Sequence, residues 1–151
     1  MNELNPSINE NLLDLQKILI EKGVVDLSDL GIIRFTGEDT LTFLQGQLSC
    51  DVLKVTPTQA QYGCYCSPKG RVLANFILAA DHTGEAWYMQ MPRTILDKIV
   101  KRLSMYVLRA KVKLVDYSAE SIRLGIVGSQ AHSLIEKSLP TLAMPESRLS
   151  V

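Results

Sequence analysis

Two cations and one amide, Lys69, Arg71 and Asn75, are the residues whose types and spacing best suit ligand binding. The cations flank Gly70 just after a proline, a pattern that favours a tight turn between two strands. Asn75 follows in a strand that is otherwise apolar. Cations at a hairpin tip, close to a polar group in an apolar strand, can bind an anionic and partly aromatic ligand. The simpler interpretation is that both cations are only solvated.

Three cysteines offer a second kind of chemistry. Cys64 and Cys66 are two residues apart in a predicted strand, so both side chains should point to the same face. They could be soft ligands of a metal or cluster. Two thiolates are too few for a closed site, however, and Cys50 is distant in sequence. We therefore favour core thiols and predict no metal site.

A basic segment over residues 98–113 is the third candidate. The chain as a whole has 16 Lys+Arg and 16 Asp+Glu, so it is not a polycation built for nucleic acid. The segment itself contains no acid, and it is either a solvated helix face and strand edge or a weak contact for RNA or another anion. Its cations are Lys98, Lys101, Arg102, Arg109, Lys111 and Lys113.

Apolar periodicity predicts the elements that position these residues. The pattern predicts an α+β fold, in which an antiparallel sheet is covered on one face by helices. Thr36 offers a cap for the first helix of this fold, and Gly46 indicates either close backbone packing or a nearby helix end. The predicted elements are a helix over 8–22, a strand over 31–36, a helix that includes 41–48, strands over 59–66, 71–80 and 86–91, a helix over 92–106 and a strand over 111–117.

A new unit is predicted after Tyr117. It contains a strand over 121–127 and a helix over 129–139, which are too little to close a core of their own. The predicted parts are an N-terminal helix or extension over 1–23, an α+β domain over 24–117, and an incomplete α/β subdomain over 118–151.

The sequence favours a cytoplasmic protein. Its N-terminus has neither the basic nor the apolar region of an export signal, and no apolar run is long enough to span a membrane. An odd number of cysteines without an export signal fits a reducing compartment.

Four segments resemble, in sequence and in order, the folate-binding family that includes the T-protein of glycine cleavage. The likeness is closer to the YgfZ branch of that family, runs from about residue 27 to about residue 131, and covers only the N-terminal portion of the family. The four segments are Phe43–Val52, Ser67–Asn75, Tyr106–Val112 and Leu124–Ala131.

The resemblance implies a T-protein-like folate-binding domain with tetrahydrofolate or another reduced folate as its ligand. In YgfZ-like relatives an aromatic side chain can pack against the folate at the position of Leu30. The basic segment then becomes a further candidate for the folate's glutamate tail. The implied folate-binding residues are Leu30, Lys69, Gly70, Arg71 and Asn75.

The resemblance also separates the possible functions. Two acidic positions of T-proteins correspond here to Ala74 and Asn75, neither of which can act as a catalytic carboxylate. We predict no catalytic residue; any catalysis would be folate-dependent aminomethyl transfer. The implied role is an accessory one in iron–sulfur cluster assembly or repair, with iron–sulfur proteins as partners and an indirect effect on tRNA modification. The alternatives are an aminomethyltransferase-like enzyme and a non-catalytic module that binds RNA or protein.

Overall fold

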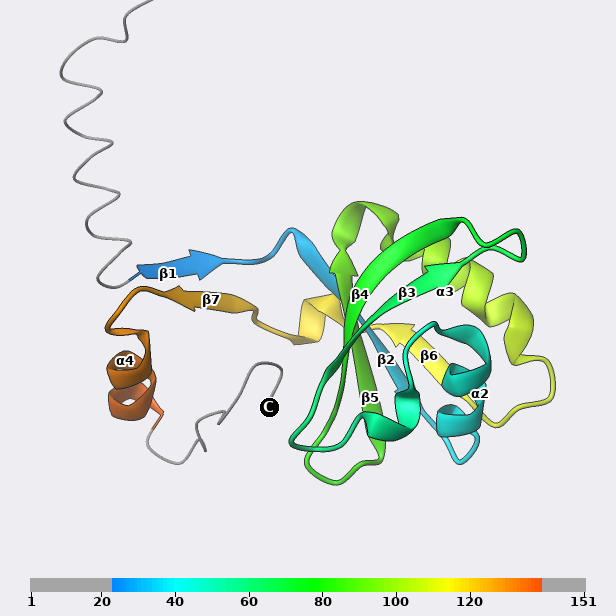
Figure 1. Ribbon diagram of the computed structural model, residues 1–151, viewed down its shortest axis with the longest axis horizontal. Coiled ribbons are helices and arrows are strands. Elements are labelled where there is room, and N and C mark those ends of the chain that lie inside the picture. The colour runs from blue at the N-terminus through cyan, green and yellow to red at the C-terminus, as the bar shows by residue number, and fades with distance from the viewer. Residues whose placement is uncertain (1–22, 140–151) are drawn as a thin grey trace, which may run out of the picture. The chain divides into compact units, whose positions relative to one another are not determined.

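The computed structural model describes residues 23–139, which form two units (Figure 1). The larger unit contains residues 28–122. The smaller one combines residues 23–27 with residues 123–139. The helix predicted over 8–22 lies outside the described residues.

The larger unit is built on a five-stranded sheet in which all neighbouring strands are antiparallel. The element order β-α-β-β-β-α-β and the antiparallel α+β architecture are those predicted from the sequence. The strands, in their order across the sheet, are β3 (Gln61–Cys66), β4 (Val72–Ala80), β5 (Ala86–Pro92), β2 (Leu30–Thr36) and β6 (Lys113–Asp116), and the helices are α2 (Thr40–Gln47) and α3 (Arg93–Val107).

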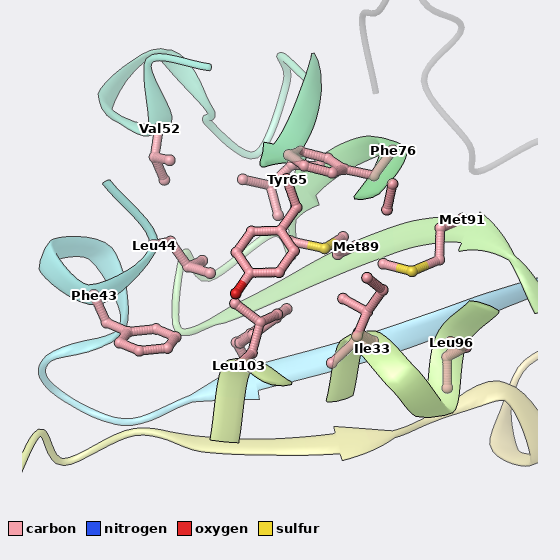
Figure 2. Packing of buried hydrophobic residues seen from close by; sticks show 14 of the residues in the cluster. Ile33, Phe43, Leu44, Val52, Tyr65, Phe76, Met89, Met91, Leu96 and Leu103 are labelled. Atoms are coloured by element: carbon pink, nitrogen blue, oxygen red, sulfur yellow. The ribbon is translucent and has the colours of Figure 1, made fainter. Parts of the chain in front are cut away.

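The core lies between the two helices and one face of the sheet. In β2, Ile33 and Phe35 are fully buried on this face, whereas Arg34 between them is only half-buried. Figure 2 shows the ring of Tyr65 in the middle of this cluster. Burying one large apolar side chain, such as Ile33 or Phe35, contributes about 1.5–3 kcal/mol to stability. The core thus anchors one face of the sheet and leaves alternate residues on the opposite face.

The start of α2 differs from the prediction. Thr36 is not a cap, because it is still part of β2 and pairs with Ala86. The chain turns at Gly37, whose φ of +118° is a conformation that favours glycine. The helix begins at Thr40. Its preceding residue, Asp39, accepts a 2.7 Å hydrogen bond from the Lys111 N–H. The cap residue therefore fixes a distant loop instead of the helix end.

Gly46 marks a helix end and not a close packing contact. The helix α2 ends one residue later, at Gln47, and no atom lies within 4 Å of the place where a Cβ on Gly46 would stand. Of the two predicted reasons for a glycine at this position, only the nearby helix end is confirmed.

The smaller unit contains a two-stranded antiparallel sheet and one helix. Strand β1 (Gly23–Asp26), which the sequence pattern did not predict, pairs with β7 (Leu124–Val127), and helix α4 (Ala131–Ser138) follows. None of the described residues of this unit is buried. An isolated two-stranded sheet of this kind is only marginally stable.

None of the helices in the described part of the chain is long and apolar enough to cross a membrane.

Candidate functional site

The turn between β3 and β4 carries Lys69, Gly70 and Arg71, all three exposed. Gly70 has a φ of +75°, and its N–H donates a 2.9 Å hydrogen bond to the Ser67 carbonyl. The Ser67 hydroxyl in turn accepts a 3.1 Å bond from the Arg71 N–H. The turn is therefore held by its own backbone, and the two cationic side chains are free to extend into solvent.

Asn75 is exposed on the face of the sheet opposite the helices. Its neighbours Ala74 and Phe76 are 3% and 4% exposed and belong to the core, so strand alternation places Asn75 on the other face. Cys64 on β3 is its direct partner, and the Cys64 thiol donates a 3.3 Å hydrogen bond to the Asn75 Oδ1. Of the two positions that correspond to T-protein acids, only Asn75 can therefore contact a ligand on this face.

Leu30 lies on the same face as Asn75. It opens β2, is half-buried and pairs with Pro92, whereas the next residue, Gly31, is buried on the helix side. Strand β5 lies between β2 and β4, so the two Cα atoms are at least about 10 Å apart. The fold thus brings the predicted Leu30 and Asn75 to one face of the sheet, with β5 between them and its Pro92 paired with Leu30.

A row of paired residues crosses this face beside Leu30 and Asn75. Its members are apolar, aromatic or amide side chains, and none is an acid. A flat heteroaromatic ring can pack on such a floor and exchange hydrogen bonds with its amide groups. From β3 to the end of β6, the row consists of Tyr62, Ile77, Gln90, Ile32 and Tyr117.

Arg34 is a residue on this face that the sequence analysis missed. Its guanidinium carbon lies 5.4 Å from the centroid of the Tyr117 ring, and that ring lies 5.7 Å from the ring of Tyr88. Its buried Nε has no hydrogen-bond partner among the described residues. Arg34 also lines a cavity of about 520 Å³ at the end of the sheet. The signal in the sequence was a single charge inside the apolar strand 31–36.

The hairpin cations are displaced from Asn75 along β4. Arg71 and Asn75 are four residues apart, which corresponds to about 13 Å in an extended strand. The base of the turn, Ser67 and Pro68, borders a small cavity with Arg102 of α3 on the helix side. A ligand that contacts both Asn75 and Arg71 must therefore be elongated.

Residues 13–149 match the GCVT N-terminal domain. The chain belongs to the GCVT N-terminal domain family. This match confirms the family that the four sequence segments indicated.

The relatives of this GCVT N-terminal domain include proteins named tRNA-modifying protein YgfZ. The one from Vibrio vulnificus strain YJ016 is 34% identical over 125 residues, which are 83% of this chain and 37% of the relative. The one from strain CMCP6 is 33% identical over 130 residues, or 86% of this chain and 39% of the relative. The chain therefore spans somewhat more than a third of the length of these relatives.

A solved structure shows the same fold. The aminomethyltransferase T of the glycine cleavage system from Bartonella henselae superposes with a TM-score of 0.76 at 17% identity, covering 90% of this chain and 36% of that protein.

Two of the cysteines, Cys64 and Cys66, lie in β3 and have different neighbours. Cys64 and Cys66 occupy alternate positions of β3, and the extra residue of the bulge between their pairs is Leu73 of β4. Cys64 contacts Asn75, whereas Cys66 lines the helix-side cavity with Arg102. Within residues 23–139, no three His, Cys, Asp or Glu side chains are grouped as a metal would require.

Proposed function

We propose that this chain is the folate-binding part of an accessory protein of the YgfZ type, with tetrahydrofolate or another reduced folate as its ligand. The observation that carries the proposal is the exposed amide of Asn75, held by Cys64 on the helix-free face that also carries Leu30. Membership of the GCVT N-terminal domain family supports the choice of ligand.

Each predicted site residue has a part in this proposal. The pterin ring packs between Leu30 and Asn75, where the amide can both donate to and accept from the polar edge of the ring. The glutamate tail extends along β4 toward the turn, where Arg71 offers a fork of donors and Lys69 a point charge. Gly70 supplies the left-handed conformation that keeps the turn tight.

The site supports an accessory role better than aminomethyl transfer. Asn75 cannot exchange a proton as a carboxylate does, and Ala74 is buried in the core. No acid occurs in the row from Tyr62 to Tyr117. We therefore extend the proposal to iron–sulfur cluster assembly or repair, with iron–sulfur proteins as partners and tRNA modification as the process that is indirectly affected. The relatives' name, tRNA-modifying protein, agrees with that last part.

Calorimetric titration with tetrahydrofolate, under anaerobic and reducing conditions, tests the proposal. We expect saturable binding at one site, weakened about tenfold in Asn75→Ala because a hydrogen-bonding group is lost. Arg71→Ala should weaken binding several-fold through the loss of a charged contact. Neither change should lower the melting temperature much, since both side chains are exposed.

The matched control is Gln47→Ala, which removes an amide from the end of α2 on the other side of the sheet. This variant should bind the folate like the wild type. Unchanged affinity in both site variants would reject the site, and absence of binding by the wild type would reject folate as the ligand of this chain.

A further inference from the structure

A groove along α3 combines an apolar lining with cations. Its volume is about 340 Å³, and it lies between the helix and the first residues of β4. No acid contributes to it. We call it the α3 groove; its lining residues are Leu73, Ile95, Lys98, Ile99, Lys101, Arg102 and Met105.

The α3 groove continues toward the hairpin turn. Arg102 lines both the groove and the smaller cavity of about 170 Å³ that includes Pro68 and Tyr106. Because Lys69 and Arg71 lie between Pro68 and Leu73, they border the same surface. Figure 1 shows the β3–β4 hairpin beside α3. Two cationic segments about thirty residues apart in sequence thus form one basic surface.

The charge of this surface is not neutralised within the described residues. No ion pair there involves Lys69, Arg71, Lys98, Lys101 or Arg102. Other cations of the same unit do have acidic partners: Lys111 pairs with Glu38, Arg93 with Asp116 and Lys54 with Asp51. The single acid of α3, Asp97, lines neither cavity. These five cations, which have no acidic partner among the described residues, therefore form a site for a ligand that carries several negative charges.

The apolar and aromatic side chains narrow the class of ligand. Tyr106, which is 41% exposed, and Met105, which is 63% exposed, lie beside Arg102. A row of cations that follows a phosphate backbone, next to an aromatic ring on which a base can stack, is typical of single-strand binding. A duplex would offer its phosphates but no unstacked bases to the apolar lining.

We propose that the α3 groove and the adjoining hairpin turn bind single-stranded RNA. The proposal deepens the tRNA-related part of the proposed function and rests on it. Phosphates would contact the five cations, while one base stacks on Tyr106 and another packs on the apolar lining. The face that carries Leu30 and Asn75 lies on the opposite side of the sheet, and the two proposed sites share only Lys69 and Arg71. Variants of Lys98 and Lys101 therefore test RNA binding separately from folate binding.

Fluorescence anisotropy with a labelled twelve-nucleotide oligouridine RNA, measured over a range of salt concentrations, tests this inference on the full chain. With four or five phosphate contacts, the slope of log K against log salt should be about −3. The double variant Lys98→Gln/Lys101→Gln should reduce the magnitude of that slope by about 1.4, because two contacts of about 0.7 each are lost. Its tetrahydrofolate affinity should equal that of the wild type.

Two further variants separate this site from general electrostatic attraction. The control Lys54→Gln/Lys137→Gln removes the same charge from exposed positions outside the groove and should keep the wild-type slope. Tyr106→Ala should weaken RNA binding about tenfold through lost stacking, and Tyr106→Phe should restore it.

Equal loss of RNA affinity in both double variants would overturn the inference. An RNA affinity that does not depend on salt concentration would also overturn it. A third contrary result would be an oligoglutamate of equal charge that binds as tightly as the RNA and whose affinity is unchanged by Tyr106→Ala; this result would indicate an acidic polypeptide as the partner. Folate binding without RNA binding would reject only the RNA site. RNA binding without folate binding would reject only the folate proposal.

Discussion

The Cys64 thiol donates a 3.3 Å hydrogen bond to the amide oxygen of Asn75 across two paired strands. This contact makes Cys64 a reporter of the proposed folate site. A folate bound against Asn75 would cover the thiol and exclude an alkylating reagent from it. Cys66 is an internal reference, because it pairs with Val72 instead of Asn75 and borders the cavity with Arg102.

We expect saturating tetrahydrofolate to slow the alkylation of Cys64 by iodoacetamide at least about fivefold. This factor corresponds to about 1 kcal/mol of protection, well below the free energy of micromolar binding. Mass spectrometry of the labelled peptides gives the rate at each cysteine. The rate at Cys66 should not change. Equal rates at Cys64 with and without the folate would place the ligand elsewhere.

The alkylation rate of Cys50 should depend on pH differently in the folded and in the unfolded chain. Burial raises the pKa of its thiol, and the nearby charges of Asp51 and Cys64 raise it further, although a backbone hydrogen bond opposes them. Since the thiolate is the reactive form, the alkylation rate of Cys50 in the folded chain should rise at a higher pH than in the urea-unfolded chain. Rates measured on the Cys50 peptide from pH 7 to 10.5 test this. Coinciding profiles would contradict it.

Leu30 offers a test by gain of affinity. The resemblance to YgfZ-like proteins implies an aromatic ring against the folate at this position, and Leu30 is half-buried at the start of β2. In Leu30→Tyr, ring stacking should add about 1 kcal/mol to folate binding, or roughly a fivefold increase in affinity. Leu30→Met is the matched control, because it keeps the apolar volume without a ring. Equal calorimetric affinities of the two variants would remove Leu30 from the site.

The larger unit follows from local patterns in the sequence. The sequence correctly predicted a strand over 31–36 and a helix over 92–106. The structure buries Ile33 and Phe35 of the strand and Ile99 and Leu103 of the helix in the core. Each of these elements packs one apolar face against the same core. The periodicity of apolar residues within a single element is therefore enough to predict it.

Features that depend on distant pairing were not predictable in this way. Strand β1 is four residues long, and its partner β7 begins about a hundred residues later. The bulge opposite Cys66 is a property of two strands together. The approach of the hairpin turn to Arg102 is likewise tertiary. The cations of the basic surface could therefore be identified in the sequence, but the approach of the hairpin turn to α3 could not be predicted from it.

Two glycines, Gly37 and Gly46, should respond oppositely to substitution. Gly37→Ala should destabilise the chain by about 3 kcal/mol, because its positive φ disfavours a side chain and an added Cβ would collide with the Lys111 carbonyl. Gly46→Ala should instead stabilise it by about 0.5–1 kcal/mol, since the position is helical, exposed and open. Urea unfolding of both variants measures these changes. Equal effects would contradict the different backbone roles.

The acid sensitivity of the fold should depend in part on Asp116. Burial raises the pKa of this carboxyl, but hydrogen bonds from the Ser118 hydroxyl and N–H and from the Arg93 guanidinium outweigh burial, so its pKa is lowered. Ser118 also accepts a 2.9 Å hydrogen bond from the Ile32 N–H. The carboxylate thus helps to fix the chain after β6 against the centre of the sheet.

A carboxyl whose pKa is lower in the folded than in the unfolded chain stabilises the fold at pH values above its pKa in the unfolded chain, about 3.9. This stabilisation is lost as the pH falls through the pKa of the folded chain. Asp116→Ala should therefore lower the free energy of unfolding by about 1 kcal/mol at pH 7, a value reduced for partial solvent exposure. The difference from wild type should shrink below about pH 4, as Asp116 becomes protonated. Urea unfolding at pH 7, 5, 4 and 3 measures it. Asp97→Ala, an exposed acid of α3, is the control. A difference that stays constant down to pH 3 would show that Asp116 acts by packing and not by charge.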